Sequence, residues 1–244
     1  MIDKSIYNYP VELQKYSVGY KVVRTDTSDV LGVVSDKYSL IKHEDVINSA
    51  IQQLKESGEK AKIHSVNMFG KYQSCMKVKI VLNEGIDFKG FTSVGEMKLM
   101  LNIVNSYNGL YKLSYSYGIF RLVCSNGMVQ PVKTNIITAK HMGEMRGLYA
   151  KLIEMKDSTV SIFNKSFQTL RKAKPIDERV LVTKTEYEEM LDRNMFKNYM
   201  SELGKNAYSE YQAYTDYISN TLSGDKQSSY EAKILPAMLK QIEE

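Results

Sequence analysis

Apolar and polar residues alternate in the middle of the chain, which is the pattern of strands with one buried face. Within residues 72–82 the apolar side chains Met76, Val78 and Ile80 stand at every second position, as expected for a half-buried strand. A second strand-like run, residues 62–69, precedes it across a short Gly-Lys turn. Two such runs joined by a short turn predict an antiparallel pair.

A second hairpin is predicted in the centre of the sequence. Residues 97–105 and 111–124 are strand-like, and a turn-rich Ser-Tyr-Asn-Gly segment joins them. Strand alternation places one set of apolar side chains of the second arm on a single face: Tyr111, Leu113, Tyr115, Tyr117 and Ile119. We therefore expect one packed face and one solvated face. Shorter strands are expected at residues 30–34, 38–41 and 135–138.

Apolar residues at helical spacing predict most of the remaining structure. A first helix is expected from Glu44 to a glycine C-cap at Gly58. From about residue 142 to Pro175 the spacing predicts one long helix or two consecutive ones. A capping box of Thr185 and Glu188 is expected to begin another helix. The helix that begins there is expected to end at about residue 200. Two further helices are expected at residues 206–222 and 230–242.

Strands followed by helices predict an α+β fold, in which a curved antiparallel sheet packed by helices precedes an all-helical C-terminal region. The segment 172–183, with its proline and mixed charges, is the candidate boundary. It divides the chain into an α+β core, residues 1–172, and a helical region, residues 173–244. A chain of 244 residues is long enough to bury a substantial core.

Composition narrows the class of protein further. Hydrophobic residues make up 43% of the chain and charged residues 25%, which is typical of folded globular domains. The sequence has no apolar run near the roughly 18 residues needed to cross a bilayer and no secretion signal at its start. Cys75 and Cys124 are too few for a disulfide framework. We therefore expect a protein that stays in the cytoplasm and makes no membrane contact.

Charge is distributed unevenly along the chain. The net charge is +5, but residues 1–140 hold 18 Lys and Arg against 12 Asp and Glu, whereas the remainder is nearly balanced. Between Glu96 and Glu144 there is no acidic residue. The basic residues of this window are Lys98, Lys112, Arg121, Lys133 and Lys140. Such a segment predicts a surface that tolerates anions.

Enzymatic motifs are absent from the sequence. The three histidines, His43, His64 and His141, fall in different predicted elements and show no metal-ligand spacing. No phosphate-binding glycine loop and no nucleophile motif occurs. Acidic pairs such as Glu44 and Asp45 lie at predicted helix starts, where they interact favourably with the helix dipole. We expect no catalytic residue, no metal and no cofactor, and therefore a protein that is not an enzyme.

The acid-free window also contains interleaved aromatic and amide side chains. Cations contact phosphates, aromatic rings stack on bases and amides can reach base edges, so this mixture is typical of proteins that bind single-stranded nucleic acid. Tyr115 and Tyr117 are the candidate stacking residues, and Lys98 and Lys112 are candidate phosphate contacts. The alternative for the two tyrosines is a structural role as half-buried residues of the sheet.

Four tyrosines repeat at every third position of a predicted C-terminal helix: Tyr208, Tyr211, Tyr214 and Tyr217. A spacing of three drifts slowly around a helix, so these rings can line one groove. Packing on a neighbouring helix or on a second subunit is the more common role of such a stripe. The sequence therefore predicts contact with a neighbouring helix, or with a partner in a homo-oligomer.

Several blocks of the sequence resemble a known family. They are the strand-turn-tyrosine block 33–38, the turn Asn105–Gly109, the Arg-x-Val-Cys-x-Asn block 121–126 and the pair Lys140-His141. Together they resemble the phage/plasmid-like protein family, a domain of unknown function found in bacteriophages, plasmids and bacteria. Many relatives have His-Asp-Gly where this chain has Tyr-Asn-Gly at 107–109, which weakens any metal site inferred from the family. Lys140 stands where arginine is common.

The family is in turn distantly similar to phage and eukaryotic single-strand annealing proteins, in which a curved antiparallel sheet backed by a helix assembles into rings. This similarity implies that Arg121, Lys133 and Lys140 line a basic groove for the backbone of single-stranded DNA or RNA. Arg121 would contact a phosphate through its guanidinium fork, and Lys112, Lys133 and Lys140 through point charges. The resemblance further implies DNA recombination by annealing, in the bacterial host cytoplasm.

Two other functions compete with nucleic-acid binding. One is a phage-encoded protein that binds a host or viral protein through its tyrosine stripe and methionine-rich helices, without affinity for nucleic acid. The other is a nuclease or nucleotide-processing enzyme that uses scattered carboxylates and a metal ion. The acid-free window argues against a carboxylate cluster near the central hairpin.

Overall fold

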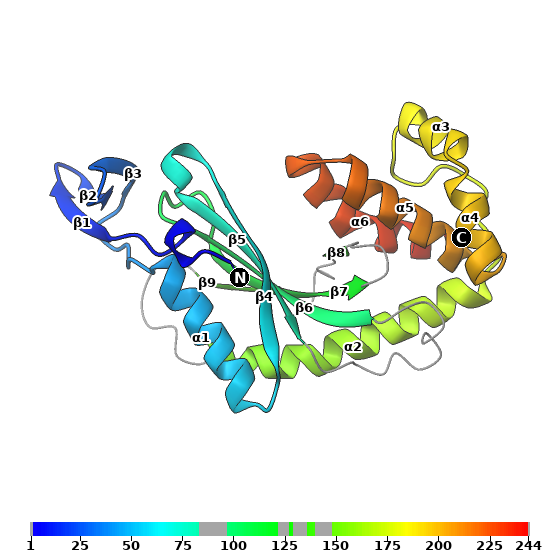
Figure 1. Cartoon of the computed structure of the whole chain (residues 1–244), viewed down its shortest axis with the longest axis horizontal. Helices are drawn as coiled ribbons and strands as arrows, with labels where there is room; N and C mark the ends of the chain where they lie inside the picture. Colours follow the sequence, from blue (N-terminus) through cyan, green and yellow to red (C-terminus); the bar gives the residue numbers. More distant parts are fainter. Residues whose placement is uncertain (1, 83–96, 122–126, 129–135, 140–147, 244) are drawn as a thin grey trace. The chain divides into compact units, whose positions relative to one another are not determined.

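The computed structural model describes residues 2–82, 97–121, 127–128, 136–139 and 148–243 (Figure 1). These residues form two compact units, which are described separately. The first unit contains residues 2–82, 100–117, 136–139 and 148–156, and the second contains most of the helices. The division into an α+β core, residues 1–172, and a helical region, residues 173–244, stays a prediction. The long helix α2 contributes residues to both compact units.

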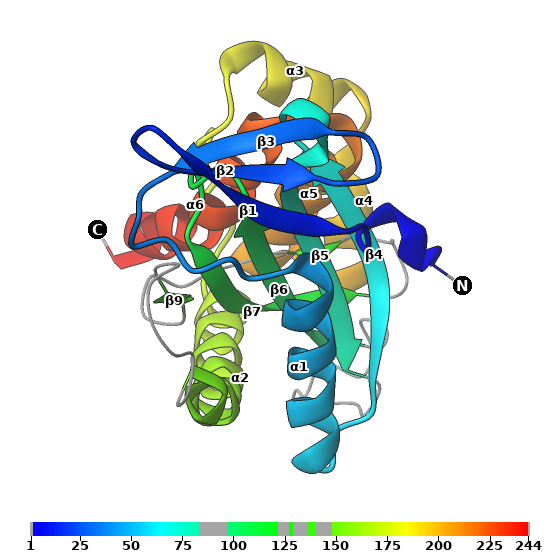
Figure 2. The ribbon, with the colours of Figure 1, turned by 90° about the vertical axis from the view of Figure 1, so that its left-hand side faces the viewer.

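The chain begins with a short 3-10 helix, η1 (Lys4–Ile6), and a small antiparallel sheet of β1 (Val11–Tyr16), β2 (Gly19–Arg24) and β3 (Asp29–Val34) in that order. Figure 2 shows these three strands as one layer. The strand predicted at residues 30–34 is confirmed. No strand forms at residues 38–41, where the prediction was wrong. There the Tyr38 hydroxyl reaches across to donate to the backbone oxygen of Ser106, at 3.1 Å.

Helix α1 (His43–Glu56) follows the small sheet and confirms the first predicted helix. Its buried residues Val46, Ile47, Ala50 and Leu54 lie at the predicted helical spacing. The C-cap of the helix is Ser57, just before Gly58, whose φ of +85° is the left-handed conformation that favours glycine. In Figure 2 the helix runs alongside β4, which it contacts.

A larger antiparallel sheet contains both predicted hairpins. Its strands run in the order β4-β5-β6-β7-β8, and β9 also pairs with β7. Their bounds are β4 (Ala61–Phe69), β5 (Cys75–Leu82), β6 (Met97–Ser106), β7 (Leu113–Arg121), β8 (Gly127–Met128) and β9 (Ile136–Ala139), with the 3-10 turn η2 (Lys71–Gln73) between β4 and β5. In β7, Leu113, Tyr115 and Tyr117 are buried while Ser114 and Ser116 are partly exposed. The predicted alternation is confirmed for residues 113–117. Tyr111 was wrongly placed on the packed face, because it precedes β7 in the turn and is exposed, and the side chain of Ile119 lies outside the described residues.

The remaining helices are α2 (Leu148–Lys172), α3 (Lys184–Asp192), α4 (Met195–Leu203), α5 (Ala207–Thr221) and α6 (Gly224–Glu243). One helix was predicted from Thr185 to about residue 200, but the chain breaks it at Asn194, whose φ is +53°. The capping box was placed two residues too late. Thr183 Oγ1 accepts from the backbone N of Glu186 at 3.3 Å, and the Glu186 carboxylate accepts from the backbone N of Thr183 at 2.7 Å.

Together these elements give an α+β fold with antiparallel sheets and an all-helical C-terminal region, as predicted. The core of the second unit is aromatic and includes Phe163, Phe167, Phe196 and the tyrosines of α5. Figure 1 shows α5 and α6 running side by side. Within the described residues, none of the helices is both long enough and apolar enough to cross a membrane.

Candidate functional site

The tips of two hairpins meet in the first unit. One tip, residues 70–74, joins β4 to β5, and the other, residues 107–112, joins β6 to β7. The backbone N of Tyr107 donates to the backbone oxygen of Ser74 at 2.8 Å, and Asn108 Nδ2 donates to Ser74 Oγ at 3.0 Å. These two bonds hold the tips side by side.

The exposed part of the two tips combines aromatic rings with cations. Tyr72 is 44% exposed and Tyr111 40% exposed, and Leu110 beside them is 76% exposed. Lys71 places its Nζ 4.8 Å from the centre of the Tyr72 ring, and Lys112 is exposed next to Tyr111. The ring of Phe69 packs edge-on against Tyr111, with centroids 5.5 Å apart. We call these residues the hairpin-tip surface: Phe69, Lys71, Tyr72, Leu110, Tyr111 and Lys112.

The two hairpins that form the hairpin-tip surface contain no acidic residue. Neither residues 61–82 nor residues 97–121 contain an aspartate or a glutamate. The two lysines therefore act without a counter-charge from their own hairpins. A cationic surface with exposed rings favours anionic ligands that have flat, stackable groups.

The turn that carries Tyr72 has an unusual backbone. Tyr72 and the next residue, Gln73, both have positive φ angles, +53° and +60°. The left-handed region costs a non-glycine residue about 1–2 kcal/mol, so two in succession need support from surrounding contacts. The conformation turns the chain tightly between β4 and β5 while keeping the Tyr72 ring at the surface.

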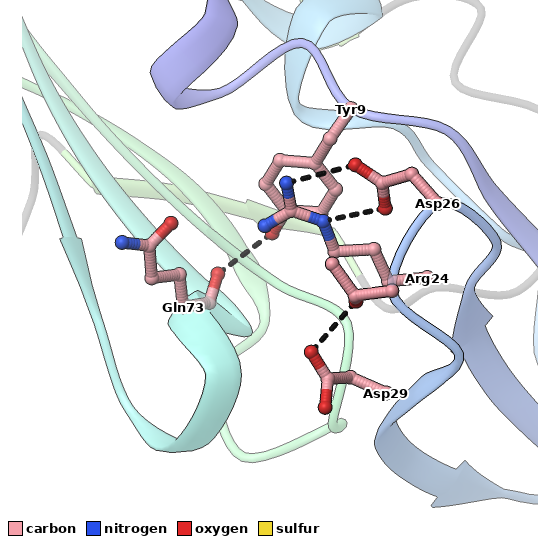
Figure 3. Close-up of polar contacts among 6 residues, drawn as sticks. Tyr9, Arg24, Asp26, Asp29 and Gln73 are labelled. Atoms are coloured by element: carbon pink, nitrogen blue, oxygen red, sulfur yellow. Dashed lines mark hydrogen bonds and ion pairs between the residues drawn. The ribbon is translucent and has the colours of Figure 1, made fainter.

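Tyr9, from the segment before β1, supplies one of these contacts. Its hydroxyl donates to the backbone oxygen of Gln73 at 2.7 Å. Arg24 lies over the Tyr9 ring, 4.1 Å from its centre, and is itself held by Asp26 through bonds of 2.8 and 3.0 Å (Figure 3). Burial raises the pKa of Tyr9, although the positive charge of Arg24 opposes the shift. The hydroxyl therefore stays protonated and able to donate.

Replacing Tyr9 with phenylalanine tests this support. The change removes the bond to Gln73 and keeps the ring that Arg24 covers. We expect the free energy of unfolding to fall by about 1 kcal/mol, the usual net value of one hydrogen bond, as measured by urea denaturation. Tyr16→Phe is the matched control, because Tyr16 is an exposed tyrosine at the end of β1, the strand that follows Tyr9. An equal loss in both variants would contradict the role assigned to Tyr9.

The family model of a domain of unknown function, DUF932, matches residues 30–232, which is well over half of the chain. The chain belongs to this family. Comparison with curated proteins and with solved structures found no significant match. The DUF932 match includes the whole hairpin-tip surface, whereas Tyr9 and Arg24 precede it.

Two blocks on which the family resemblance rests are joined inside the DUF932 region. The Tyr38 hydroxyl bonds to Ser106, and the Tyr107 hydroxyl accepts from the backbone N of His43 at 2.8 Å. Asn105 Nδ2 lies 3.0 Å from Nδ1 of His43, whose ring packs on Tyr107 with centroids 3.9 Å apart. All these contacts are buried or partly buried, so the described side chains of these blocks hold α1 and the two sheets together. The blocks at 121–126 and 140–141 lie outside the described side chains.

The nucleic-acid residues predicted from sequence are not gathered at one described place. Lys112 is exposed on the hairpin-tip surface, whereas Lys98 is partly buried in β6 and belongs to the second unit. Tyr115 and Tyr117 are buried, which fits the structural alternative and leaves no ring face for a base in this conformation. The backbone of Arg121 lies in β7, but its side chain is outside the described part, as are Lys133 and Lys140.

The tyrosine stripe of α5 is buried within its own chain. Tyr208 packs on Phe167 with ring centroids 5.4 Å apart, and Tyr214 packs on Phe196 at 5.3 Å. Tyr211 is also buried, and the Tyr217 hydroxyl donates to the Glu189 carboxylate at 2.6 Å. Burial, together with that carboxylate, raises the pKa of Tyr217 to about 12. The four tyrosines thus pack on neighbouring helices of the same chain, and their rings are buried and not accessible to a partner subunit.

Sequence reasoning missed Lys71, Tyr72 and Tyr9 as contributors to a site. The available signal was the Gly70-Lys71-Tyr72 turn between two alternating strands, which places a cation and a ring at a hairpin tip. Among the described side chains, no three His, Cys, Asp or Glu residues cluster in a way that could hold a metal ion.

Proposed function

We propose that this protein binds single-stranded nucleic acid, without bond chemistry, through the hairpin-tip surface. The observation that carries the proposal is the exposure of Tyr72 and Tyr111 beside Lys71 and Lys112 in two hairpins that have no acidic residue. Stacking on an exposed ring contributes about 1–3 kcal/mol per base, and lysines supply the salt-dependent contact with phosphates.

The arrangement favours a single strand over a duplex. Bases in a duplex are stacked on each other and present only their edges, whereas a single strand can place the face of a base on a tyrosine ring. Tyr72 lies in a tight turn with two left-handed residues, so the protein loses less conformational entropy when the ligand binds. Two rings suit a strand that stacks one base on each.

The family resemblance supports a finer version of this proposal. The resemblance implies that proteins of this kind hold a strand chiefly by its phosphates, so that bases not stacked on a ring stay available for a complement. Annealing in phage recombination needs no more chemistry than this. The same version includes a homo-oligomer, whose contacts would have to come from surfaces other than the buried tyrosine stripe.

Fluorescence anisotropy with labelled single-stranded and duplex oligonucleotides tests the proposal. We expect Tyr72→Ala and Tyr111→Ala each to weaken single-strand binding by about 5- to 150-fold, the equivalent of the stacking energy of one base. The double variant Lys71→Ala/Lys112→Ala should flatten the dependence of log K on log salt by about 0.7 for each phosphate that is no longer neutralised.

Tyr16 and Lys21 provide a matched control. Tyr16 is 45% exposed with Lys21 Nζ 4.2 Å from its ring centre, but this pair lies on the β1–β2 hairpin, which contains Glu12. Tyr16→Ala and Lys21→Ala should leave binding unchanged. No binding at low salt, or equal losses in the two sets of variants, would overturn the proposal. The absence of binding would also favour the alternative function, binding of a protein partner, for which exposed Leu110 offers an apolar contact.

A further inference from the structure

The helical unit contains a cavity of about 500 Å³. Its walls come from α3, α4, α5 and the segment before α3, all of which belong to the second unit. Tyr187 and Phe196, whose ring centroids are 5.4 Å apart, form an aromatic part of the wall, and Met200 and Leu191 extend it. A volume of this size lies within the range of roughly 300–1,000 Å³ usual for small-molecule pockets.

One carboxylate in the wall is buried. Glu210 of α5 is 4% exposed and accepts hydrogen bonds from the backbone N of Ile176, at 2.6 Å, and of Asp177, at 3.0 Å. No lysine or arginine of the described side chains is paired with it. Two backbone donors satisfy part of the hydrogen-bonding capacity of a carboxylate but do not neutralise its charge. A buried charge without a counter-charge is costly.

The electrostatic surroundings of Glu210 are negative. Burial raises its pKa above the ordinary value, the two backbone donors oppose the shift, and the charge of Asp177 adds to it. The pKa of Tyr187 is raised by burial and by the negative charges of Glu210, Asp177 and Glu178. Lys197 and Lys205 also line the cavity, but both are exposed, and neither contributes to the shifts of these two groups. The part of the wall formed by Glu210, Asp177 and Tyr187 is therefore acidic and aromatic.

We propose that this cavity binds an organic cation, in which an ammonium or guanidinium group on an apolar or aromatic stem sits against Glu210 and Tyr187. The cation supplies the missing counter-charge for Glu210, and the face of an aromatic ring adds cation–π attraction of about 0.5–2 kcal/mol. The stem packs on Phe196, Met200 and Leu191. The site is independent of the hairpin-tip surface, and nucleic acid has no group of this kind.

Isothermal titration of the full chain with phenethylamine tests the proposal, and 2-phenylethanol is the matched neutral probe. We expect the amine to bind at least tenfold more tightly than the alcohol. Glu210→Gln should abolish the difference, and Asp177→Asn, at an exposed position, should reduce it. Equal affinity for the two probes in the wild-type protein would overturn the proposal. Because the comparison of the two probes uses only the wild-type protein, it tests the proposal even if Glu210→Gln fails to fold.

The dependence on pH gives a second readout. Only the ionised form of Glu210 attracts a cation, and its pKa in the folded protein is raised. Binding of the amine should therefore strengthen as the pH rises through that raised pKa and weaken as it falls, whereas binding of the alcohol should stay constant. A capped Phe-Arg dipeptide amide distinguishes the sources of the cation. Tighter binding of this peptide than of phenethylamine assigns the pocket to a side chain of a protein partner, and weaker binding assigns it to a free amine.

Discussion

Replacing Phe167 with alanine is expected to lower the free energy of unfolding by about 3–5 kcal/mol, the usual cost of removing a buried phenylalanine. Phe167 is fully buried in α2 and contacts three other rings, with centroid distances of 5.7 Å to Phe163, 5.4 Å to Tyr208 and 5.8 Å to Tyr211. The substitution would leave a cavity bounded by aromatic side chains, and surrounding side chains usually relax only partly into such a space.

Urea denaturation monitored by circular dichroism measures this loss. Lys165→Ala is the control, because Lys165 is exposed on the same helix and should change stability by less than about 0.5 kcal/mol. A loss below about 1 kcal/mol for Phe167→Ala, well under the usual cost for a buried ring, would show that the aromatic core of the second unit does not pack as described.

Gly32→Ala is expected to destabilise the first unit by about 3 kcal/mol, at the upper end for an overpacked site. A Cβ at this position would stand 2.5 Å from the Cα of Asn108, 2.9 Å from its Cβ and 3.2 Å from the backbone oxygen of Tyr107. Because these atoms are backbone or directly attached to it, no side-chain rotation relieves the clash. Strand β3 and the tip of the β6–β7 hairpin would have to separate, and affinity for single-stranded nucleic acid should fall with stability.

Gly58→Ala separates this steric effect from the loss of glycine's backbone freedom. Gly58 has a φ of +85°, but a Cβ there would meet no atom within 4 Å. Its substitution should cost about 1–2 kcal/mol from backbone strain alone and leave nucleic-acid binding intact. If Gly58→Ala proves the more damaging of the two, the close approach of β3 to the hairpin tip is not what Gly32 provides.

The local periodicity of apolar residues was sufficient to predict the strands and helices in which that pattern is regular. The alternation of β5 and β7 and the helical spacing of α1 come from side chains a few residues apart, so they can be recognised without tertiary information. Strands β1 and β2 were missed because exposed residues such as Glu12 and Lys15, and the partly exposed Lys21, interrupt their apolar pattern. Their pairing becomes evident only when the three strands are seen together.

The candidate site was less predictable because it depends on contacts between distant segments. Alternation correctly put Tyr115 and Tyr117 on one face, but only tertiary packing decides that this face is covered. Tyr72 and Tyr111 lie on the tips of two separate hairpins, and the bonds from Tyr107 and Asn108 to Ser74 that join these tips cannot be recognised from a local sequence pattern. For the tyrosine stripe, the choice between a neighbouring helix and another subunit likewise depended on the helices that surround α5.

The contact between Tyr9 and Gln73 has a consequence for how the domain can be divided. A polypeptide that began at residue 30, where the DUF932 match begins, would keep every side chain of the hairpin-tip surface and lose the hydroxyl that holds its strained turn. It would retain the chemistry needed for binding but not its preorganisation. Family members that lack this N-terminal segment would need another donor at the turn, or glycine in place of its left-handed residues.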